Sequence, residues 1–415
     1  MDISSKIFRK KTDDYFISLD IGSEIVKALV VEIDKTNEKA FILGAGERRQ
    51  KDDNTLIASK DNFRNIISVC IGAIDDAVEI AGTRPKKVII GMNGSFVKGV
   101  STKINYKRQT YKDRIDENEL KKIIFMIRES LGENVREIVQ VKENFGFEID
   151  ITYSSVTNIN IDGYRVMSPV GFKGSDVQFT IFSSFLRKSH HQLMKNISAE
   201  LNLELLEVIS EPYAVSIAKG TKDVSKSNII LVDIGGNVTS VAVIHNGLLE
   251  HIETFDLGGK SFTRSLSNEL NLKDLETENI KKRFNKDSVD KALADKIEEF
   301  FIDNYKVLLD GIELSLEEYT QIDLFPATVL FYGGGSQILR NNKEAIINLI
   351  KKRSTFLSQM NVNFVNTSDL TEIIDKTNKL KNLQYINSMS LANFILDKAI
   401  EENQCDKILN SAIIK

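Results

Sequence analysis

The stretch that decides the fold is Ile229–Gly247, IILVDIGGNVTSVAVIHNG, in which one apolar run ends at Asp233 and another follows a pair of glycines. A near-copy lies earlier, at Phe16–Asp34, FISLDIGSEIVKALVVEID. Aligning Asp20 with Asp233 places the copies 213 positions apart (233 − 20), about half the chain. Each copy predicts a strand, a tight turn that glycine permits, and a returning strand. The sequence therefore predicts a duplicated fold.

Composition limits the class of protein. The 415 residues are 42% hydrophobic and 27% charged, with a net charge of −4, so no global basic field indicates nucleic acid. The two cysteines, Cys70 and Cys405, fit a reducing compartment and exclude a disulfide framework. No apolar run approaches the roughly 18 residues of a membrane-spanning helix, and no secretory signal is predicted. The basic segment Lys6–Lys11 is expected to be a solvated leader, with a weak electrostatic contact to anionic lipid as the alternative.

Helices and strands alternate along the chain, which predicts α/β layers. Helical spacing predicts helices at 61–81, 117–131, 187–201 and 291–316, and a glycine turn and helix after 256. Further strands are predicted at 87–92, 177–185, 203–209 and 327–332, and a third strand is expected to follow the second hairpin. The four histidines, at positions 190, 191, 245 and 251, lack metal-ligand spacing and are expected at the surface or in turns.

Between positions 97 and 175 the pattern changes to a strand, a helix, and short strands around 136–145 and 158–166, which predicts an inserted α+β subdomain. The expected organisation has six segments, which are listed here. They are a leader (1–13), the first half (14–96), the insert (97–175), the rest of the first half with a connecting helix (176–222), the second half (223–400), and a C-terminal helix or tail (401–415).

The two hairpins together predict a phosphate site. Backbone N–H groups at a glycine turn form concavities that bind phosphate oxygens. Asp20 and Asp233 each end a strand there, and two carboxylates beside phosphates require a divalent cation. Mg²⁺ fits because it keeps several waters while it bridges carboxylates to phosphates. Neither copy has the pattern of a Walker A or a dinucleotide-binding loop.

A third glycine element, VLFYGGGSQILRNN, places Gly333, Gly334 and Gly335 between an apolar strand and a helix. Three glycines let the backbone approach a flat group such as a purine or its ribose, and Ser336 is expected to cap the helix. The alternative is a plain strand-to-helix turn, which seldom needs three glycines.

This arrangement resembles the actin/Hsp70/sugar-kinase ATPase superfamily. The first phosphate loop of that superfamily matches DIGSEIVK, the second matches DIGGNVTS, and the adenosine loop matches GGGS. SEPYAVSIAKG resembles its connecting helix, whose acidic residue positions the attacking water, and the resemblance implies that role for Glu211. The alternative is that Glu211 is a first-turn carboxylate favoured by the helix dipole. Pro212 fits the start of a helix.

Within the superfamily the chain resembles the bacterial cell-division FtsA family most. MSPVGFKGSDVQFTIFSSF is similar to the segment by which that family leaves its inserted subdomain, with Ser168 and Phe172 departing from the pattern. LGGKSFTRSLS is similar to its Gly-Gly helix start, and ENIKKRF to a stretch that faces adenosine. The resemblance covers roughly residues 14–400. FtsA proteins usually end in an amphipathic membrane helix, which this chain lacks, so an ordinary packed terminal helix is expected.

The resemblance and the turns together imply one set of ATP and Mg²⁺ site residues. The expected phosphate-side residues are Asp20, Gly22, Ser23, Lys27, Asp233, Gly235, Gly236, Asn237 and Thr239. The expected residues on the adenosine side are Glu278, Lys281, Gly333, Gly334, Gly335 and Ser336, and Gly258 and Gly259 are expected in the same nucleotide site. Asp20 and Asp233 are expected to hold Mg²⁺ through water. Any ATP hydrolysis is expected to be slow, because no second base or arginine finger is evident.

The leading functional prediction is a cytoplasmic ATP-binding FtsA-type protein. The resemblance implies filaments by self-association, binding of the FtsZ C-terminal peptide, and peripheral contact with the membrane at the division site. The alternative is a PilM-like adaptor of type IV pilus assembly, which would bind ATP and a peptide of an inner-membrane pilus protein. The SPVGFKG segment favours the first and the two termini favour the second. A sugar kinase or an Hsp70-type chaperone is a minor alternative, because neither a sugar-pocket base nor a peptide-binding domain is evident.

Overall fold

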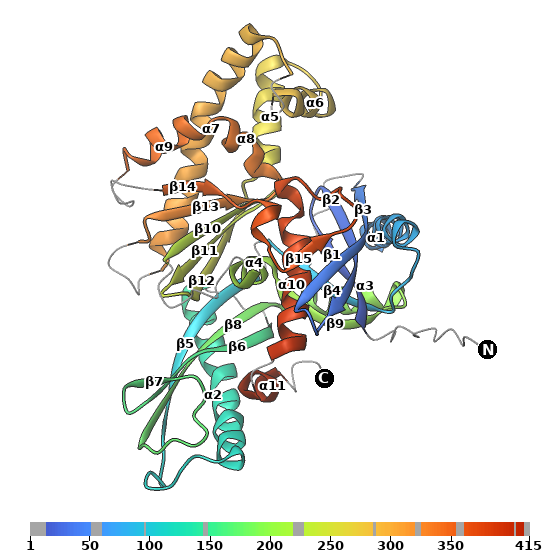
Figure 1. Ribbon diagram of the computed structural model, residues 1–415. Helices are drawn as coiled ribbons and strands as arrows, with labels where there is room; N and C mark the ends of the chain where they lie inside the picture. Colours follow the sequence, from blue (N-terminus) through green and yellow to red (C-terminus); the bar gives the residue numbers. More distant parts are fainter. Residues whose placement is uncertain are drawn as a thin grey trace, which may run out of the picture.

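A computed structural model describes most of the chain (Figure 1). The described residues are 14–50, 60–94, 97–143, 148–218, 228–284, 288–319, 325–353, 361–401 and 404–410. The basic segment Lys6–Lys11 lies outside them. Among the described helices, none combines the length and the apolar character that crossing a membrane requires.

The first sheet has six strands in the order β15-β3-β2-β1-β4-β9. Their bounds are β1 Tyr15–Ile21, β2 Ile25–Asp34, β3 Lys39–Arg49, β4 Lys87–Met92, β9 Glu204–Ser210 and β15 Ile373–Asp375. β1, β2 and β3 form an antiparallel meander, and β4 and β9 then add in parallel beside β1. The predicted strand at 87–92 is confirmed, and the predicted strand at 203–209 differs by one residue at each end.

The second sheet has nine strands in the order β14-β13-β10-β11-β12-β5-β8-β6-β7. Their bounds are β5 Val97–Lys107, β6 Ile149–Ile161, β7 Tyr164–Val166, β8 Asp176–Arg187, β10 Ile229–Ile234, β11 Thr239–His245, β12 Leu248–Phe255, β13 Thr328–Tyr332 and β14 Asn361–Phe364. β10, β11 and β12 repeat the antiparallel meander, and β13 and β14 add in parallel beside β10.

The two sheets therefore share the strand order third-second-first-fourth-fifth, which confirms the predicted duplication. The registers agree as well, because Asp20 lies opposite Lys27 in the first hairpin and Asp233 lies opposite Ser240 in the second. Asp233 lies 213 positions after Asp20, and Ser240 lies 213 positions after Lys27, which is the offset of the sequence alignment. This pair of five-stranded units is the actin-like fold.

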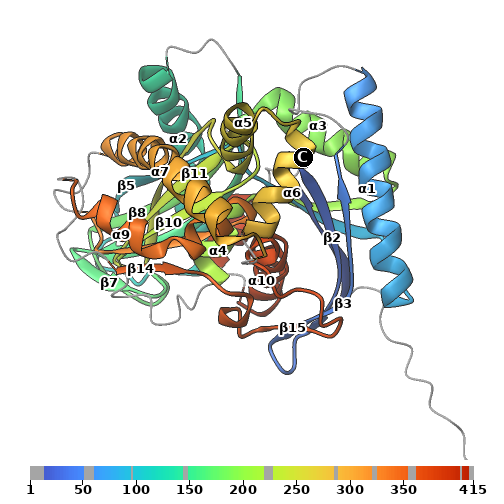
Figure 2. The same cartoon turned by 90° about the horizontal axis from the view of Figure 1, so that it is seen from above.

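Helices cover and connect the sheets (Figures 1 and 2). Their bounds are α1 Lys60–Ala81, α2 Glu117–Glu143, α3 Lys188–Glu200, α4 Glu211–Ala218, α5 Gly259–Leu270, α6 Asp274–Phe284, α7 Lys291–Glu317, α8 Gln337–Asn341, α9 Lys343–Ile350, α10 Ile386–Glu401 and α11 Gln404–Asn410. α4 and α10 pack against each other in the region between the two halves. α10 also packs on β1, β2 and β4, and β15 pairs with β3. β15 and α10, which up to residue 400 were assigned from sequence to the second half, thus contact the first sheet.

The inserted region is built from β5, α2, β6, β7 and β8, and α2 packs on it through a buried apolar cluster. The short strand predicted at 136–145 is wrong, because α2 continues to Glu143. Local β-branched residues suggested a strand there, but intrinsic β propensity is weak when helical continuation satisfies the backbone. The hairpin predicted around 158–166 is confirmed as β6 and β7.

The insert is continuous with the second half through β5, which pairs with β12. α11 packs on α2 and on β6, so the chain returns to the insert near its end (Figure 1). Asn410 binds both the N–H and the C=O of Ser154 at 3.0 and 2.7 Å, and Asp406 accepts the N–H of Val156 at 2.7 Å. These side chains satisfy backbone groups of β6 that no strand pairs. An ordinary packed terminal helix is what the sequence predicted.

Candidate functional site

The carboxylate that ends β1 is paired with a lysine. Asp20 is 2% exposed, and Lys27 directly opposite on β2 places its Nζ 2.8 Å from the Asp20 Oδ2. Burial lowers the pKa of Lys27, but the charge and hydrogen bond of Asp20 outweigh burial, so that the pKa is raised. This end of the site therefore contains a buried ion pair formed across one hairpin.

The carboxylate that ends β10 has no such cation, because the residue opposite it is Ser240. Asp233 is 1% exposed, and its Oδ2 accepts hydrogen bonds from Asn93 and from Asn387, the latter at 2.9 Å. Burial raises the pKa of Asp233 to about 7, the negative charge of Asp20 adds to this, and the two amides oppose it. A proton or a cation is therefore favourable at this carboxylate.

Glu211, the first residue of α4, is the third buried carboxylate of the site. Burial raises its pKa well above the ordinary value, the neighbouring Asp20 and Asp233 raise it further, and Lys27 opposes them. The structure thus brings Glu211 together with the two strand-end aspartates, as the resemblance predicted. Within a buried group of three carboxyls and one lysine, bound protons or an added cation must offset the excess negative charge.

Unpartnered polar atoms surround Asp233. Its own Oδ1, the Asn387 Oδ1 and the Tyr332 hydroxyl are buried, and within the described residues they have no hydrogen-bond partner. Tyr332 lies opposite Asp233 on β13, so these atoms belong to one region. Asn237 in the second turn has an unpartnered Oδ1 as well. Such atoms carry a cost unless a ligand or water satisfies them, and the three beside Asp233 indicate a binding site.

Backbone packing joins the second turn to the start of α5. The N–H of Gly259 donates to Gly235 at 2.9 Å, and the N–H of Lys260 donates to Gly236 at 2.8 Å. A Cβ on Gly258 would lie 2.6 Å from the Gly236 oxygen, which only glycine avoids. Gly258 and Gly259, expected in the nucleotide site, therefore pack directly against the second glycine turn.

The triple glycine lies against the same turn. Gly333 has φ 84°, and a Cβ there would lie 2.1 Å from the Asp233 Oδ1. A Cβ on Gly335 would lie 2.7 Å from the Gly235 oxygen. The side chain of Ser336 does not cap α8, so that prediction is wrong: its hydroxyl donates to the Gly333 oxygen at 2.7 Å instead. The serine sits in a 3₁₀ turn, where the nearest acceptor lies three residues before it.

Glu278 and Lys281 form a buried network with the start of α5. The Lys281 Nζ lies 2.7 Å from Glu278 and donates to the Gly259 oxygen at 2.8 Å. Thr263 donates to Glu278 at 2.6 Å. Burial lowers the pKa of Lys281 more than the Glu278 charge raises it. Both residues are thus near the glycine turns, and their contacts hold α5 and α6 together beside them.

The tips of the two hairpins meet. The Ser23 Oγ lies 2.9 Å from the position that a Cβ on Gly236 would take. Glu24 pairs with Lys260 across the halves and with Arg49 at 3.0 Å within the first. Thr239 is fully buried, and its hydroxyl donates to the Leu257 oxygen at 2.6 Å. Gly22 is in the first turn, and its oxygen accepts from Gln50 at 2.6 Å.

The residues present fit a magnesium nucleotide. Two aspartates from equivalent strand ends meet in one buried group, and their carboxylates suit Mg²⁺ bound through water. Within the described ranges, no group of three or more His, Cys, Asp or Glu side chains is arranged to hold a metal by itself. Sequence reasoning missed Asn93 and Asn387, because each follows an apolar element in an ordinary loop or helix start. Only the tertiary structure places them on Asp233.

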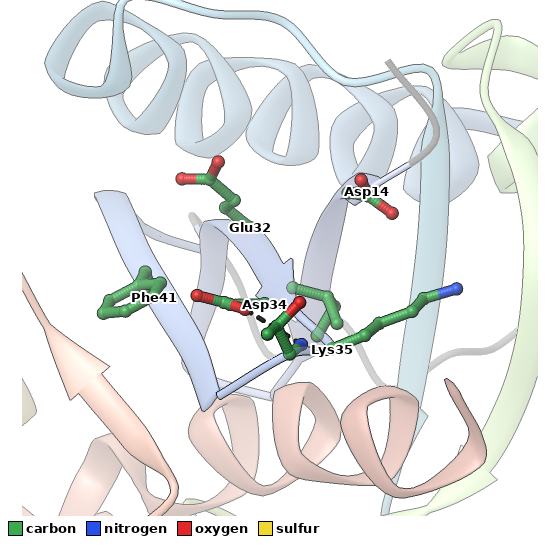
Figure 3. A pocket seen from close by; sticks show the side chains of 7 residues that line it. Asp14, Glu32, Asp34, Lys35 and Phe41 are labelled. Atoms are coloured by element: carbon green, nitrogen blue, oxygen red, sulfur yellow. Dashed lines mark hydrogen bonds between the residues drawn. The ribbon is translucent and has the colours of Figure 1, made fainter. Parts of the chain in front are cut away.

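A cavity of about 260 Å³ lies at the opposite end of the first hairpin (Figure 3). Its lining residues are Asp14, Glu32, Ile33, Asp34, Lys35, Thr36 and Phe41. Glu32 accepts from the Tyr15 hydroxyl at 2.9 Å, and Asp34 accepts from Asn37, which is the main reason that its pKa is lowered. These carboxylates accept hydrogen bonds from β1 and from the turn after β2. The cavity lies at the far end of the hairpin from the candidate site.

Two histidines are not where the sequence analysis expected them. His191 is 6% exposed, and its Nδ1 lies 2.9 Å from the Asp150 carboxylate. His251 is 7% exposed and stacks on Tyr319 with ring centroids 5.4 Å apart. The expectation of surface or turn positions is wrong for both, because the buried ring of His191 bonds Asp150 and the buried ring of His251 packs on Tyr319.

Comparisons with known proteins agree with this architecture. The family profile of the cell division protein FtsA matches residues 230–387. The cell division protein FtsA of Bacillus subtilis is 24% identical over 69% of this chain and 61% of its own length. FtsA of Pseudomonas aeruginosa is 20% identical over 78% of each chain. The match thus spans about three fifths of the Bacillus subtilis relative.

A solved structure of the PilM-PilN type IV pilus biogenesis complex is also similar. It superposes with a TM-score of 0.63 at 16% identity, covering 93% of this chain and 98% of that chain. At this identity the likeness concerns the fold. Strand order, hairpin register and these comparisons together show an actin-like ATPase fold whose sequence is similar to that of the FtsA cell-division family.

Proposed function

We propose that this chain binds ATP with Mg²⁺ between its two hairpins. The observation that supports this best is the buried group around Asp233, in which a carboxylate oxygen and neighbouring polar atoms have no partner in the described part of the chain. These atoms lie where two equivalent glycine turns meet. A nucleotide with its cation would supply both the charge and the hydrogen bonds that this group lacks.

The proposed roles follow from the positions of the residues. Asp20 and Asp233 would hold Mg²⁺ through water, and Mg²⁺ would neutralise the phosphate charge. The first turn with Gly22, Ser23 and Lys27 would contact phosphate oxygens from one side. Gly235, Gly236, Asn237 and Thr239 would form the other side. The triple glycine and Ser336, with Gly258, Gly259, Glu278 and Lys281 behind them, would form the wall next to the adenosine.

Glu211 is the proposed group that orients an attacking water. It is the first residue of α4 and lies next to both aspartates. Burial and the neighbouring aspartates raise its pKa, and a bound cation nearby would lower that pKa and favour the charged form that a base requires. Slow hydrolysis is therefore proposed, with assembly rather than turnover as the output.

The proposed cellular role is that of an FtsA-type cell-division protein. The sequence similarity to FtsA proteins of two organisms supports it. Under this proposal the chain assembles into filaments on the cytoplasmic face of the membrane and binds the C-terminal peptide of FtsZ. Attachment to the membrane would use the basic segment near the N-terminus or a partner.

A second candidate is an adaptor of type IV pilus assembly. The superposition on the PilM-PilN complex over nearly the whole of both chains favours it. Such an adaptor would bind ATP in the same place and a cytoplasmic peptide of an inner-membrane pilus protein. The two candidates differ in the peptide and share the nucleotide site.

Two labelled peptides distinguish these roles in fluorescence anisotropy with Mg-ATP. One is the C-terminal tail of the FtsZ of the same organism, and the other is the cytoplasmic N-terminus of its pilus inner-membrane protein. Micromolar binding of the first alone supports the division role. Binding of the second alone contradicts that role and supports the adaptor. A thermal shift titration with ATP, with and without Mg²⁺, tests the nucleotide site independently.

A further inference from the structure

The chain crosses from one half to the other at the start of the insert. β4 belongs to the first sheet, and β5, the next strand, belongs to the second. In the described part of the chain, β5 pairs with β12 through two residue pairs, Gly99 with Ile252 and Val100 with His251. A ladder this short depends on the contacts at its ends. Asn93 directly follows β4 and stands four residues before β5 begins.

The side chain of Asn93 is held mainly by the second half. Its Nδ2 donates to the Asp233 Oδ2, and its Oδ1 accepts from the Ser240 hydroxyl. The N–H of Gly94 also donates to the Oδ1, at 2.8 Å. One carboxamide therefore connects the carboxylate of the candidate site to the segment that leads into the insert.

Two further contacts fasten the start of β5 to β12. The Lys98 Nζ lies 3.0 Å from the Glu253 Oε1. The Ser101 hydroxyl donates to the Leu249 oxygen at 3.0 Å. Together with the short ladder, they dock the insert on the second half immediately after Asn93.

The insert is also fastened to the first half, through the C-terminal helices. α11 is bonded to β6 by Asp406 and Asn410. It follows α10, whose first turn is fixed to β1 because the Ser18 hydroxyl donates to the Ser388 oxygen at 2.6 Å. The insert therefore contacts both halves, and the β5–β12 contact is the one that lies next to Asn93.

We propose that Asn93 is a positioning residue that couples the state of the Asp233 carboxylate to the docking of the insert on β12. The nucleotide-dependent part of this coupling rests on the proposed ATP site, whereas the structural part does not. A cation near Asp233 draws electron density from the oxygen that accepts from Asn93. The Asn93 carboxamide must then shift, or its hydrogen bond to Asp233 must weaken. Asn93 lies just before the segment that enters β5.

The test is hydrogen exchange of the amides in β5 and β12, first without nucleotide. Asn93→Ala should speed exchange in 97–107 and 248–255 by about tenfold, as expected for the loss of one or two hydrogen bonds. Asn387→Ala is the matched control, because it removes the other amide from the same Asp233 oxygen but lies on α10. The control should leave these amides within about twofold of the wild type. Equal exchange in wild type and Asn93→Ala would overturn the proposal.

The second arm adds Mg-ATP. In the wild type, exchange in 97–107 should change on binding, and in Asn93→Ala the change should be lost although nucleotide still binds. Binding without any change in the wild type would overturn the coupling. Absence of binding would instead contradict the proposed function, and the nucleotide-free arm would still decide the structural part. Asn93→Ser, compared in the same way, replaces the alanine variant if that variant does not fold.

Discussion

The two hairpin ends occupy equivalent positions in the fold, but their buried aspartates have different partners. Asp20 faces Lys27 across its ladder at 2.8 Å, whereas Asp233 faces Ser240 and is bonded by two neutral amides. The two hairpins thus share the carboxylate but not the lysine opposite it. Burial without a cation raises the pKa of Asp233 to about 7. The second end is therefore the one at which a buried carboxylate has no lysine directly opposite it.

The largest expected effect comes from removing the cation at the first end. Lys27→Met should lower the free energy of unfolding at pH 8 by about 3–5 kcal/mol, because it leaves buried Asp20 without its partner. Urea unfolding measures it, with the exposed Lys188→Met as the control that should change little. A loss below about 1 kcal/mol at pH 8 would show that the two ends do not differ as described.

The next effect concerns the ligand rather than the fold. Asp233→Ala should keep the fold but lose the stabilisation by Mg-ATP, which for the wild type is about 2.7 kcal/mol at a ligand concentration 100 times Kd. Thermal shift assays with and without Mg-ATP measure it. Asp256→Ala, which removes an exposed carboxylate just after β12, should retain the full shift. An unchanged shift in Asp233→Ala would contradict the placement of the second phosphate turn.

A third effect is the pH dependence of the protein without nucleotide. The pKa of Asp233 rises from 3.8 to about 7 on folding, so the folded state holds a proton that the unfolded state releases between these values. The contribution of this group to stability is therefore greatest below pH 3.8 and falls as the pH rises to about 7. Asp233→Asn should flatten the fall of Tm between pH 5 and 8. An identical slope in the two proteins would mean that Asp233 does not titrate there.

The smallest effect concerns Ser240, which occupies the position in the second hairpin that Lys27 occupies in the first. Ser240→Ala should cost about 1 kcal/mol, because it removes a hydroxyl that bonds Asn93 and Thr254. Chemical denaturation measures the cost, and Ser388→Ala, another fully buried hydroxyl, provides the comparison. A cost above about 3 kcal/mol would mean that the serine, rather than the two amides, is the main support of Asp233.

Much of the fold could be predicted from local pattern. The two hairpins with their glycines, the parallel strands after them and the long helices all follow from periodicity and turn residues. Errors arose where tertiary packing overrode local preference. The segment at 136–143 continued a helix despite its β-branched residues, and the Ser336 hydroxyl bonded the Gly333 oxygen instead of capping α8.

Local sequence pattern was enough to predict the duplicated hairpins, with their carboxylates and the glycines that permit their tight turns. These features are local, because strand alternation and backbone freedom are properties of neighbouring residues. The tertiary structure was needed to show that Asn93 and Asn387 bind Asp233. It also showed that β5 pairs in the second sheet and that α11 packs along β6 and bonds its backbone. These contacts join residues more than a hundred positions apart, and buried polar atoms select such partners through three-dimensional packing, which no local spacing records.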